Sequence, residues 1–293
     1  MTLHPQPLQL NAQLQSVLSS EAAEFLATGQ RYELPGRMIW HAWGSDAAPT
    51  IVLLHGGSGS WTHWIRNIQP LVAEGYRVLA VDLPGFGDSD VPANGGDADA
   101  LVEPLHAAWQ LLRQHDNNIL MGFSFGGMTA ALWLAQYPQD AQALVMVGAP
   151  GFGLASPKRI PLKGWRHLAT ESLQAQAHRH NLMGLMLHDE ANLDEVAMRL
   201  HVLNVVRDRM TRRRLSSTPV LVEAMPKIKC PVHVIYGEFD AFYLDRLPEV
   251  ETMFKQVTPN LVLWQLVKGM GHWVQYENPT GFHRALKHTL SLV

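Results

Sequence analysis

Residues 119–127 read Ile-Leu-Met-Gly-Phe-Ser-Phe-Gly-Gly and are the most informative point of the chain. The first five form a short apolar run typical of a buried strand, and a helical pattern begins directly after Ser124. Gly122 and Gly126 stand two residues to either side of the serine, so they let the strand and the helix approach closely. The stretch therefore predicts a sharp strand-to-helix turn with an exposed serine hydroxyl at its apex.

Apolar strands and amphipathic helices alternate to both sides of this turn. Strands are expected at residues 38–43, 51–54, 76–83, 119–123, 144–147, 232–236 and 261–266, and helices at 11–29, 64–73, 97–114, 125–136, 245–254 and 279–292. This alternation predicts an α/β fold with a mostly parallel sheet and helices on both of its faces.

The alternation is interrupted in the middle of the chain. Residues 151–226 contain helical stretches and no convincing strand, so we interpret them as an inserted helical cap over one end of the sheet. The predicted organisation is a sheet domain in two parts, residues 1–150 and 227–293, with the cap between them. Ligands of such folds bind beyond the carboxyl ends of the strands, so the residues that follow each strand are the candidates for function.

The turn at Ser124 matches the pattern G-x-S-x-G in the strand–turn–helix context that this motif requires. A helix N-terminus presents free N–H groups and a partial positive charge, so the N–H of Phe125 is a natural donor to an oxyanion. His55-Gly56-Gly57 follows the first strong strand, where small residues allow a second backbone N–H, that of Gly57, to face the serine. We therefore predict Ser124 as a nucleophile and Gly57 and Phe125 as its oxyanion hole.

A nucleophilic serine needs a base and a group that orients the base. His272 follows the last predicted strand, and Asp240 follows the strand before it. The chain order Ser124, Asp240, His272 is that of hydrolases built on this kind of sheet. Glu238 and Asp245 are rival candidates for the acid, and loop position favours Asp240.

Composition and charge exclude several other classes. The 293 residues carry a net charge of −3 and no basic stripe, so we expect no nucleic-acid partner, and residues 207–214 are interpreted as a solvated helix face. No apolar run is long enough to span a bilayer and no signal peptide is evident, so no membrane association is expected. The single cysteine, Cys230, is expected to be buried and fits a cytoplasmic location. The acidic, glycine-rich stretch 82–89 lacks the spacing of nucleotide-binding loops.

Five motifs in the expected order make the chain resemble the α/β-hydrolase superfamily. They are residues 54–57 (LHGG), 82–89 (DLPGFGDS), 122–127 (GFSFGG), 237–240 (GEFD) and 271–273 (GHW). The match covers about residues 35–150 and 227–293. The resemblance implies a triad hydrolase without a metal or organic cofactor, acting on a small-molecule substrate. A homodimer is a further expectation from the superfamily.

Two stretches, residues 272–277 and 186–199, are similar to the meta-cleavage product hydrolases, which break C–C bonds in diketo acids. In that subfamily a cap arginine holds the substrate carboxylate, and Arg199 falls near its place; the alternative is a surface helix arginine. Phe123 and Phe125 stand where the subfamily has asparagine and methionine. This aromatic pair favours an apolar ester, lactone or thioester. The residues expected to contact substrate are Gly56, Phe123, Arg199 and Trp273.

Three functions follow from these patterns. The first is hydrolysis of a small, largely apolar carboxylic ester through Ser124, His272 and Asp240. The second is C–C bond hydrolysis of a meta-cleavage-type product with Arg199 on the carboxylate. The third is a ligand receptor on the same fold, because some receptors retain the triad and fold does not determine function. Dehalogenase and epoxide hydrolase activities are disfavoured, since those enzymes carry aspartate at the position of Ser124.

Overall fold

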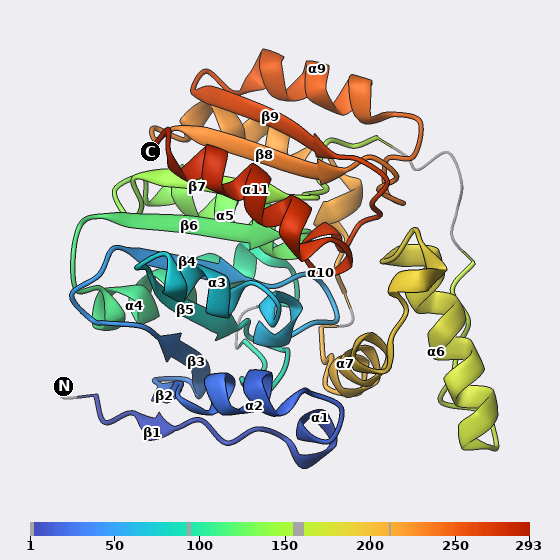
Figure 1. The fold of residues 1–293 in the computed structure, drawn as a ribbon. Helices are drawn as coiled ribbons and strands as arrows, with labels where there is room; N and C mark the ends of the chain where they lie inside the picture. The colour runs from blue at the N-terminus through green and yellow to red at the C-terminus, as the bar shows by residue number, and fades with distance from the viewer. Residues whose placement is uncertain (1–2, 93–94, 155–160, 211) are drawn as a thin grey trace.

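The computed structural model describes residues 3–92, 95–154, 161–210 and 212–293. Its centre is a nine-stranded sheet in the order β1-β2-β3-β5-β4-β6-β7-β8-β9 (Figure 1). The strands are β1 (Gln6–Pro7), β2 (Gln30–Leu34), β3 (Met38–Trp43), β4 (Thr50–Leu54), β5 (Arg77–Asp82), β6 (Asn118–Phe123), β7 (Ala143–Val147), β8 (Val232–Gly237) and β9 (Leu261–Val267). The six neighbouring strands β5, β4, β6, β7, β8 and β9 are parallel to one another, and β1 to β3 extend the sheet with antiparallel pairing.

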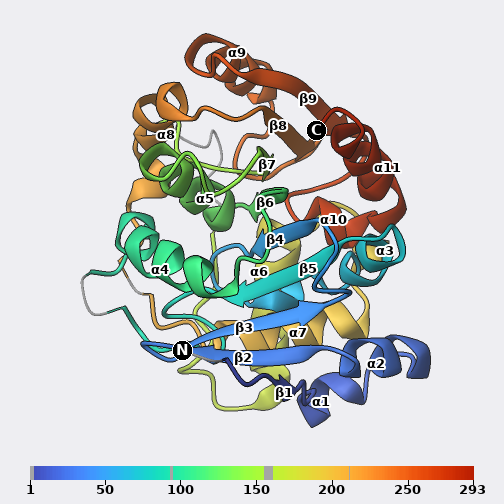
Figure 2. The same ribbon diagram turned by 90° about the vertical axis from the view of Figure 1, so that its left-hand side faces the viewer.

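Helices cover both faces of this sheet (Figure 2). They are α1 (Ala12–Gln15), α2 (Ser20–Ala27), α3 (Ile68–Ala73), α4 (Val102–Leu112), α5 (Phe125–Gln136), α6 (Glu171–Leu185), α7 (Glu195–Val205), α8 (Val220–Ala224), α9 (Leu247–Val257), α10 (Val274–Glu277) and α11 (Pro279–Leu290), with short 3-10 turns η1 (Trp61–Trp64), η2 (Ala98–Leu101), η3 (Glu190–Asn192), η4 (Leu215–Ser217) and η5 (Met225–Lys227). The expected α/β class, with a mostly parallel sheet between helices, is confirmed.

The apolar run of β4 explains why both faces are covered. Successive side chains of a strand point to opposite faces, so Val52 and Leu54 join the core under α4 and α5, whereas Ile51 and Leu53 join the core under α3 and α11. All four are buried. A strand that is apolar at every position thus needs a helical layer on each side.

The segment 151–226, here called the cap segment, contains α6, α7 and α8 and, among its described residues, no strand. Figure 1 shows α6 and α7 beyond the ends of the strands, on the side where β6 and β8 finish. This arrangement is consistent with the expected insertion, and the boundaries of the cap remain a prediction.

Two expectations about helices were wrong. The helix expected at 11–29 is two helices. The first ends at Gln15, and Ser19 caps α2 by accepting a hydrogen bond from the Ala22 N–H. The stretch 207–214 is not helical at its described residues, since α7 ends at Val205. Several of its arginines contact the sheet domain, and Arg207 pairs there with Asp88.

Candidate active site

Ser124 lies at the turn between β6 and α5, with φ 52° and ψ −118°. A non-glycine residue with positive φ is strained, and such strain persists only where the surroundings impose it. Here the Ser124 N–H donates to Val147 O at 2.7 Å, and its carbonyl accepts from Gly127 and Met128. The serine side chain makes no capping hydrogen bond to the helix, so its hydroxyl is left available.

The close approach that the glycines were expected to permit is present. A β-carbon added at Gly126 would lie 2.4 Å from the carbonyl oxygen of His55 and 2.5 Å from that of Leu54. Contacts this short with backbone atoms cannot be relieved by a side-chain rotation. Gly126 therefore lets the first turn of α5 rest directly on the end of β4, which carries the predicted oxyanion loop.

The structure brings Asp240 and His272 together. Asp240 Oδ2 lies 2.7 Å from His272 Nδ1, and both side chains are at most 1% exposed. The other carboxylate oxygen accepts the Phe242 N–H at 2.9 Å, which orients the carboxylate. The rival acids Glu238 and Asp245 are exposed. Among the three candidates, the geometry thus favours Asp240 as the partner of His272.

Ser124 and His272 lie near the same neighbouring residues. The ring of Phe123 lies 4.9 Å from that of His272, and a β-carbon at Gly148 would lie 3.1 Å from His272 Nδ1. In the described part of the chain no hydrogen bond joins the Ser124 hydroxyl to His272. Catalytic contacts of this kind often tighten only when substrate is bound, so the role of His272 as the base remains a prediction.

The two predicted oxyanion donors also remain predictions with favourable positions. Phe125 is the first residue of α5, and a helix leaves its first N–H groups without an internal acceptor. Gly57 lies near it, because a β-carbon at Gly57 would be 3.8 Å from Phe125 Cβ. Neither N–H donates to another described residue.

Two buried histidines hold the loop that carries Gly57, and sequence reasoning did not find their role. His55 Nδ1 lies 2.7 Å from Gly56 O, and His63 Nδ1 accepts the Gly56 N–H at 3.2 Å. His55 Nε2 also accepts the Leu83 N–H at 3.0 Å, which requires a neutral ring with its proton on Nδ1. The peptide of Gly56 is therefore fixed at both its N–H and its carbonyl.

Acid should destabilise this arrangement. Burial lowers the pKa of His55 from 6.5 to about 4, and burial likewise holds the pKa of His63 well below 6.5. Below pH 6.5 these two histidines bind protons in the unfolded chain but not in the folded protein, so the free energy of unfolding falls as the pH falls. We expect His55 alone to lower the free energy of unfolding by about 2 kcal/mol between pH 7.5 and pH 5.

Urea denaturation at pH 7.5, 6.5, 5.5 and 5.0, followed by tryptophan fluorescence, checks this expectation. A variant of the exposed His288, His288→Gln, should show the same pH dependence as the wild type. A free energy of unfolding that stays constant or rises toward pH 5 would contradict the assignment of His55 and His63 as neutral structural rings.

Glu277 is a second feature that the sequence did not reveal. Its buried carboxylate accepts N–H groups from two segments, Gly271 at 2.5 Å on one oxygen, and His188 at 2.7 Å and Asp189 at 2.8 Å on the other. Gly271 directly precedes His272, whereas His188 and Asp189 belong to the cap segment. Glu277 therefore ties the cap segment to the loop that carries the predicted base.

Replacing Glu277 by glutamine should lower kcat roughly 10- to 100-fold, because one acceptor oxygen becomes an NH₂ that repels a backbone N–H and shifts the His272 loop. Steady-state kinetics should place the loss in kcat rather than KM, as expected for a positioning residue. Glu238→Gln is the matched control, because exposed Glu238 accepts the Gly269 N–H of the same loop at 2.8 Å. Equal losses in the two variants would argue against a special role for Glu277.

The residues expected to contact substrate lie in different surroundings. Phe123 is fully buried against the rings of His63, Trp64 and His272. Trp273 is 1% exposed and its indole N–H already donates to His63 O at 2.9 Å. Gly56 contacts the Phe123 ring, from which an added β-carbon would lie 2.9 Å. These three shape the wall beside Ser124, and their contact with substrate remains a prediction.

Arg199 lies on α7 and is half-buried. Among the described residues it forms no hydrogen bond and no ion pair, unlike Arg207, two residues beyond the end of α7, which pairs with Asp88 at 2.9 Å. A half-buried guanidinium without a partner is compatible with the expected carboxylate contact, and that role remains a prediction.

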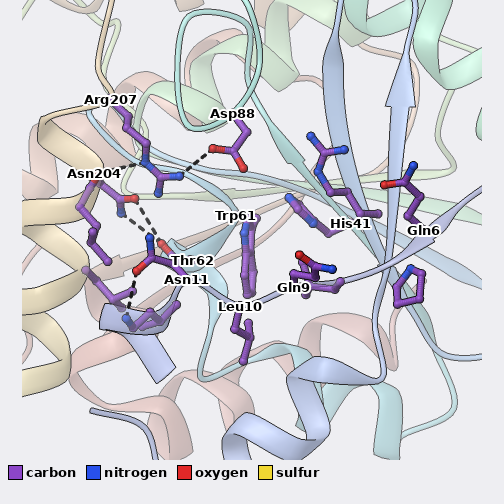
Figure 3. Close-up of a pocket in the computed structure, with 16 residues that line it drawn as sticks. Gln6, Gln9, Leu10, Asn11, His41, Trp61, Thr62, Asp88, Asn204 and Arg207 are labelled. Atoms are coloured by element: carbon purple, nitrogen blue, oxygen red, sulfur yellow. Dashed lines mark hydrogen bonds and ion pairs between the residues drawn. The ribbon is translucent and has the colours of Figure 1, made fainter. Parts of the chain in front are cut away.

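A polar pocket of about 530 Å³ lies elsewhere, between the N-terminal segment, β3 and α7. Figure 3 shows Trp61 at its centre with His41 beside it, their ring centroids 5.2 Å apart. Across it, the Asn204 amide of α7 donates to Thr62 Oγ1 at 3.1 Å. None of the predicted triad residues lines this pocket, so it is separate from the site around Ser124.

Among the described residues, no group of three or more histidine, cysteine, aspartate or glutamate side chains is arranged to hold a metal ion. None of the described helices combines the length and apolar character needed to cross a bilayer.

The sheet order, the serine turn after β6 and the Asp240–His272 pair after β8 and β9 together define a protein of the α/β-hydrolase class. Comparison with known proteins supports this class. The family model described as alpha/beta hydrolase fold matches residues 49–226, which is more than half of the chain. The chain therefore belongs to the alpha/beta hydrolase fold family.

Curated relatives show which hydrolases the chain resembles in sequence. The 2-hydroxy-6-oxononadienedioate/2-hydroxy-6-oxononatrienedioate hydrolase of Cupriavidus pinatubonensis is 29% identical over 81% of this chain and 85% of its own length. The protein of the same name from Klebsiella pneumoniae is 26% identical over 84% of this chain and 88% of its own length. The similarity to meta-cleavage product hydrolases noted in the sequence is thus confirmed.

Solved structures share the fold at lower identity. Carboxylesterase CesB from Bacillus subtilis superposes with a TM-score of 0.75 at 20% identity, over 95% of this chain and 96% of its own. Naproxen esterase from Bacillus subtilis superposes with a TM-score of 0.71 at 17% identity, over 97% of this chain and all of its own. At these identities the likeness establishes the fold alone.

Proposed function

We propose that the protein hydrolyses a small carboxylic ester, or a related lactone or thioester, through an acyl-enzyme on Ser124. The observation that carries the proposal is the buried Asp240–His272 hydrogen bond of 2.7 Å at the same sheet edge as the strained Ser124 turn. Nucleophile, base and orienting acid are the three parts that acyl transfer by serine requires. Phe123 and Phe125 beside the serine suit a largely apolar acyl group.

The proposed reaction has two halves. In the first, Ser124 Oγ attacks the carbonyl carbon while His272 Nε2 accepts the hydroxyl proton, which it then gives to the departing alcohol. In the second, His272 takes a proton from water, the hydroxide attacks the acyl-enzyme, and Ser124 recovers its proton as the acid leaves. Backbone N–H groups of Gly57 and Phe125 stabilise the oxyanion in both halves. Asp240 holds the His272 tautomer and stabilises the imidazolium.

A second candidate is C–C bond hydrolysis of a meta-cleavage-type diketo acid by the same triad. The names of the curated relatives favour it, and so does the half-buried Arg199 on α7, which has no partner among the described residues and whose planar fork suits a carboxylate. The phenylalanine at position 123, in place of the subfamily's asparagine, removes one polar contact to such a substrate and favours the ester.

Activity assays separate these proposals. The protein is incubated with p-nitrophenyl acetate and butyrate, with a yellow aromatic meta-cleavage product, and with a serine-directed fluorophosphonate. Ester turnover with labelling of Ser124 supports the first proposal, whereas turnover of the diketo acid alone supports the second. If neither substrate is turned over and Ser124 is not labelled, both fail, and a ligand receptor becomes the better description.

Arg199→Ala distinguishes the two enzyme activities further. If Arg199 holds a substrate carboxylate, the variant should lower the ratio of kcat/KM for the diketo acid to kcat/KM for p-nitrophenyl butyrate by roughly tenfold or more. An unchanged ratio would remove the carboxylate role of Arg199.

A further inference from the structure

Arg213, from the stretch that was expected to form a solvated helix face, lies over the predicted oxyanion loop instead. A β-carbon added at Gly57 would lie 2.8 Å from Arg213 Nη1, so the absence of a side chain at Gly57 makes room for this guanidinium. The guanidinium carbon also lies 5.2 Å from the ring centroid of Phe86 and 5.9 Å from that of Phe125, the residue after the nucleophile. A cation is therefore placed beside Gly57 and near the ring of Phe125.

Two side chains hold the guanidinium in this place. Arg213 Nη2 donates to Asp208 Oδ2 at 2.8 Å and to Ser58 Oγ at 3.1 Å, and the Ser58 hydroxyl donates to the same Asp208 oxygen at 2.5 Å. Ser58, directly after Gly57, has a positive φ of 51°, a strained conformation that this triangle helps to impose. Arg213 is thus anchored on one side of its fork only.

No described residue provides an acceptor on the other side of the fork. Arg213 Nη1 is buried and, among the described residues, has no hydrogen-bond partner. A buried donor of a charged group that lacks an acceptor is costly, so it calls for an explanation such as a missing ligand. The free N–H groups lie next to Gly57, within the region where the reacting carbonyl is expected to bind.

We infer that Arg213 Nη1 binds an anionic group on the substrate, a carboxylate near the scissile carbonyl. This inference rests on the proposed function, since it places the carboxylate relative to the Ser124 site. It narrows the substrate to a half-ester of a short dicarboxylic acid, in which an apolar linker passes Phe125 and the carboxylate reaches Arg213. A guanidinium stacked on aromatic rings and held by one carboxylate presents its second edge to such an anion.

The test compares monoethyl glutarate, which is anionic, with ethyl pentanoate, a neutral ester of the same acyl length, in a pH-stat. Arg213→Gln should lower the ratio of kcat/KM for the anionic ester to that for the neutral ester by roughly tenfold or more, as for a lost charge-assisted hydrogen bond. Arg213→Lys, which keeps the positive charge, should lose less. Exposed Arg214→Gln is the matched control and should leave the ratio unchanged.

A ratio unchanged in Arg213→Gln would overturn the inference. An equal loss on both esters would also overturn it, because Arg213 would then act as a general oxyanion donor or as a structural residue. Glutarate binding is measured in parallel by thermal shift, which needs no turnover. If neither ester is hydrolysed and p-nitrophenyl butyrate is not turned over either, the proposed function fails. The anion site then survives only if glutarate raises the Tm of the wild type and not that of Arg213→Gln.

Discussion

Ser124→Ala should lower kcat/KM for ester hydrolysis by roughly 10⁴-fold or more while the protein remains folded. The substitution removes the attacking atom, and the acyl-enzyme cannot form without it. The serine hydroxyl makes no capping hydrogen bond, so its loss should change the free energy of unfolding by less than about 0.5 kcal/mol. Alanine has the same backbone preferences at φ 52° as serine, so the turn should be retained.

The measurement combines initial rates on p-nitrophenyl butyrate with urea denaturation of the same samples. Ser45→Ala, at an exposed serine between β3 and β4, is the control and should have wild-type kinetics. Residual activity above one hundredth of the wild type in a folded Ser124→Ala protein would mean that another group is the nucleophile. If Ser124→Ala unfolds as well as losing activity, the role of Ser124 is tested by fluorophosphonate labelling of the wild type instead.

Asp240→Asn should lower kcat by roughly 10³- to 10⁴-fold at pH 7.5. Asp240 Oδ1 accepts the Phe242 N–H and Oδ2 faces His272 Nδ1, so the asparagine oxygen should keep the Phe242 contact and its NH₂ should face the ring. The NH₂ donates where the carboxylate accepted, which moves the imidazole proton to Nε2. An imidazole protonated at Nε2 cannot take the proton of Ser124, and the imidazolium loses its stabilising charge.

Kinetics of Asp245→Asn and Glu238→Gln provide the comparison, because these two residues are the other acids that follow β8. Both are exposed, and neither is hydrogen-bonded to His272. Their variants should retain kcat within about twofold, as expected for surface substitutions. A loss in Asp245→Asn or Glu238→Gln as large as that in Asp240→Asn would show that the acid has been misassigned.

The parts of the site that could be predicted are those encoded by neighbouring residues. The Ser124 turn depends on an apolar strand, two glycines and a helix start within nine residues, so its geometry can be anticipated from residues 119–127 alone. Positions after strands could likewise be assigned to one edge, because parallel strands bring their carboxyl ends together. The alternation of strands and helices therefore predicted both the fold class and the placement of Asp240 and His272 near the serine.

The expectation for residues 207–214 shows where such reasoning ends. A dense run of arginines is typical of a solvated surface, and nothing within the run indicates a partner. In the folded chain Arg213 reaches Ser58, 155 residues away in sequence, and Arg207 reaches Asp88, 119 residues away. Ser58 and Asp88 lie on loops of the sheet domain, and only folding brings these loops to the segment that follows α7.

The sequence by itself therefore determined the class of protein and the chain order of its predicted nucleophile, acid and base, because local patterning encodes strands, helices and the turn between them. Only the tertiary structure decided that Glu277 joins the cap segment to the His272 loop, that His63 fixes Gly56, and that Arg213 lies over Gly57. Glu277 bonds to His188 and Arg213 to Ser58 across 89 and 155 residues of sequence, and His63 bonds to Gly56 across a loop of seven residues. Such bonds form because burial removes water as the competing partner, and their partners are chosen by packing rather than by neighbouring sequence.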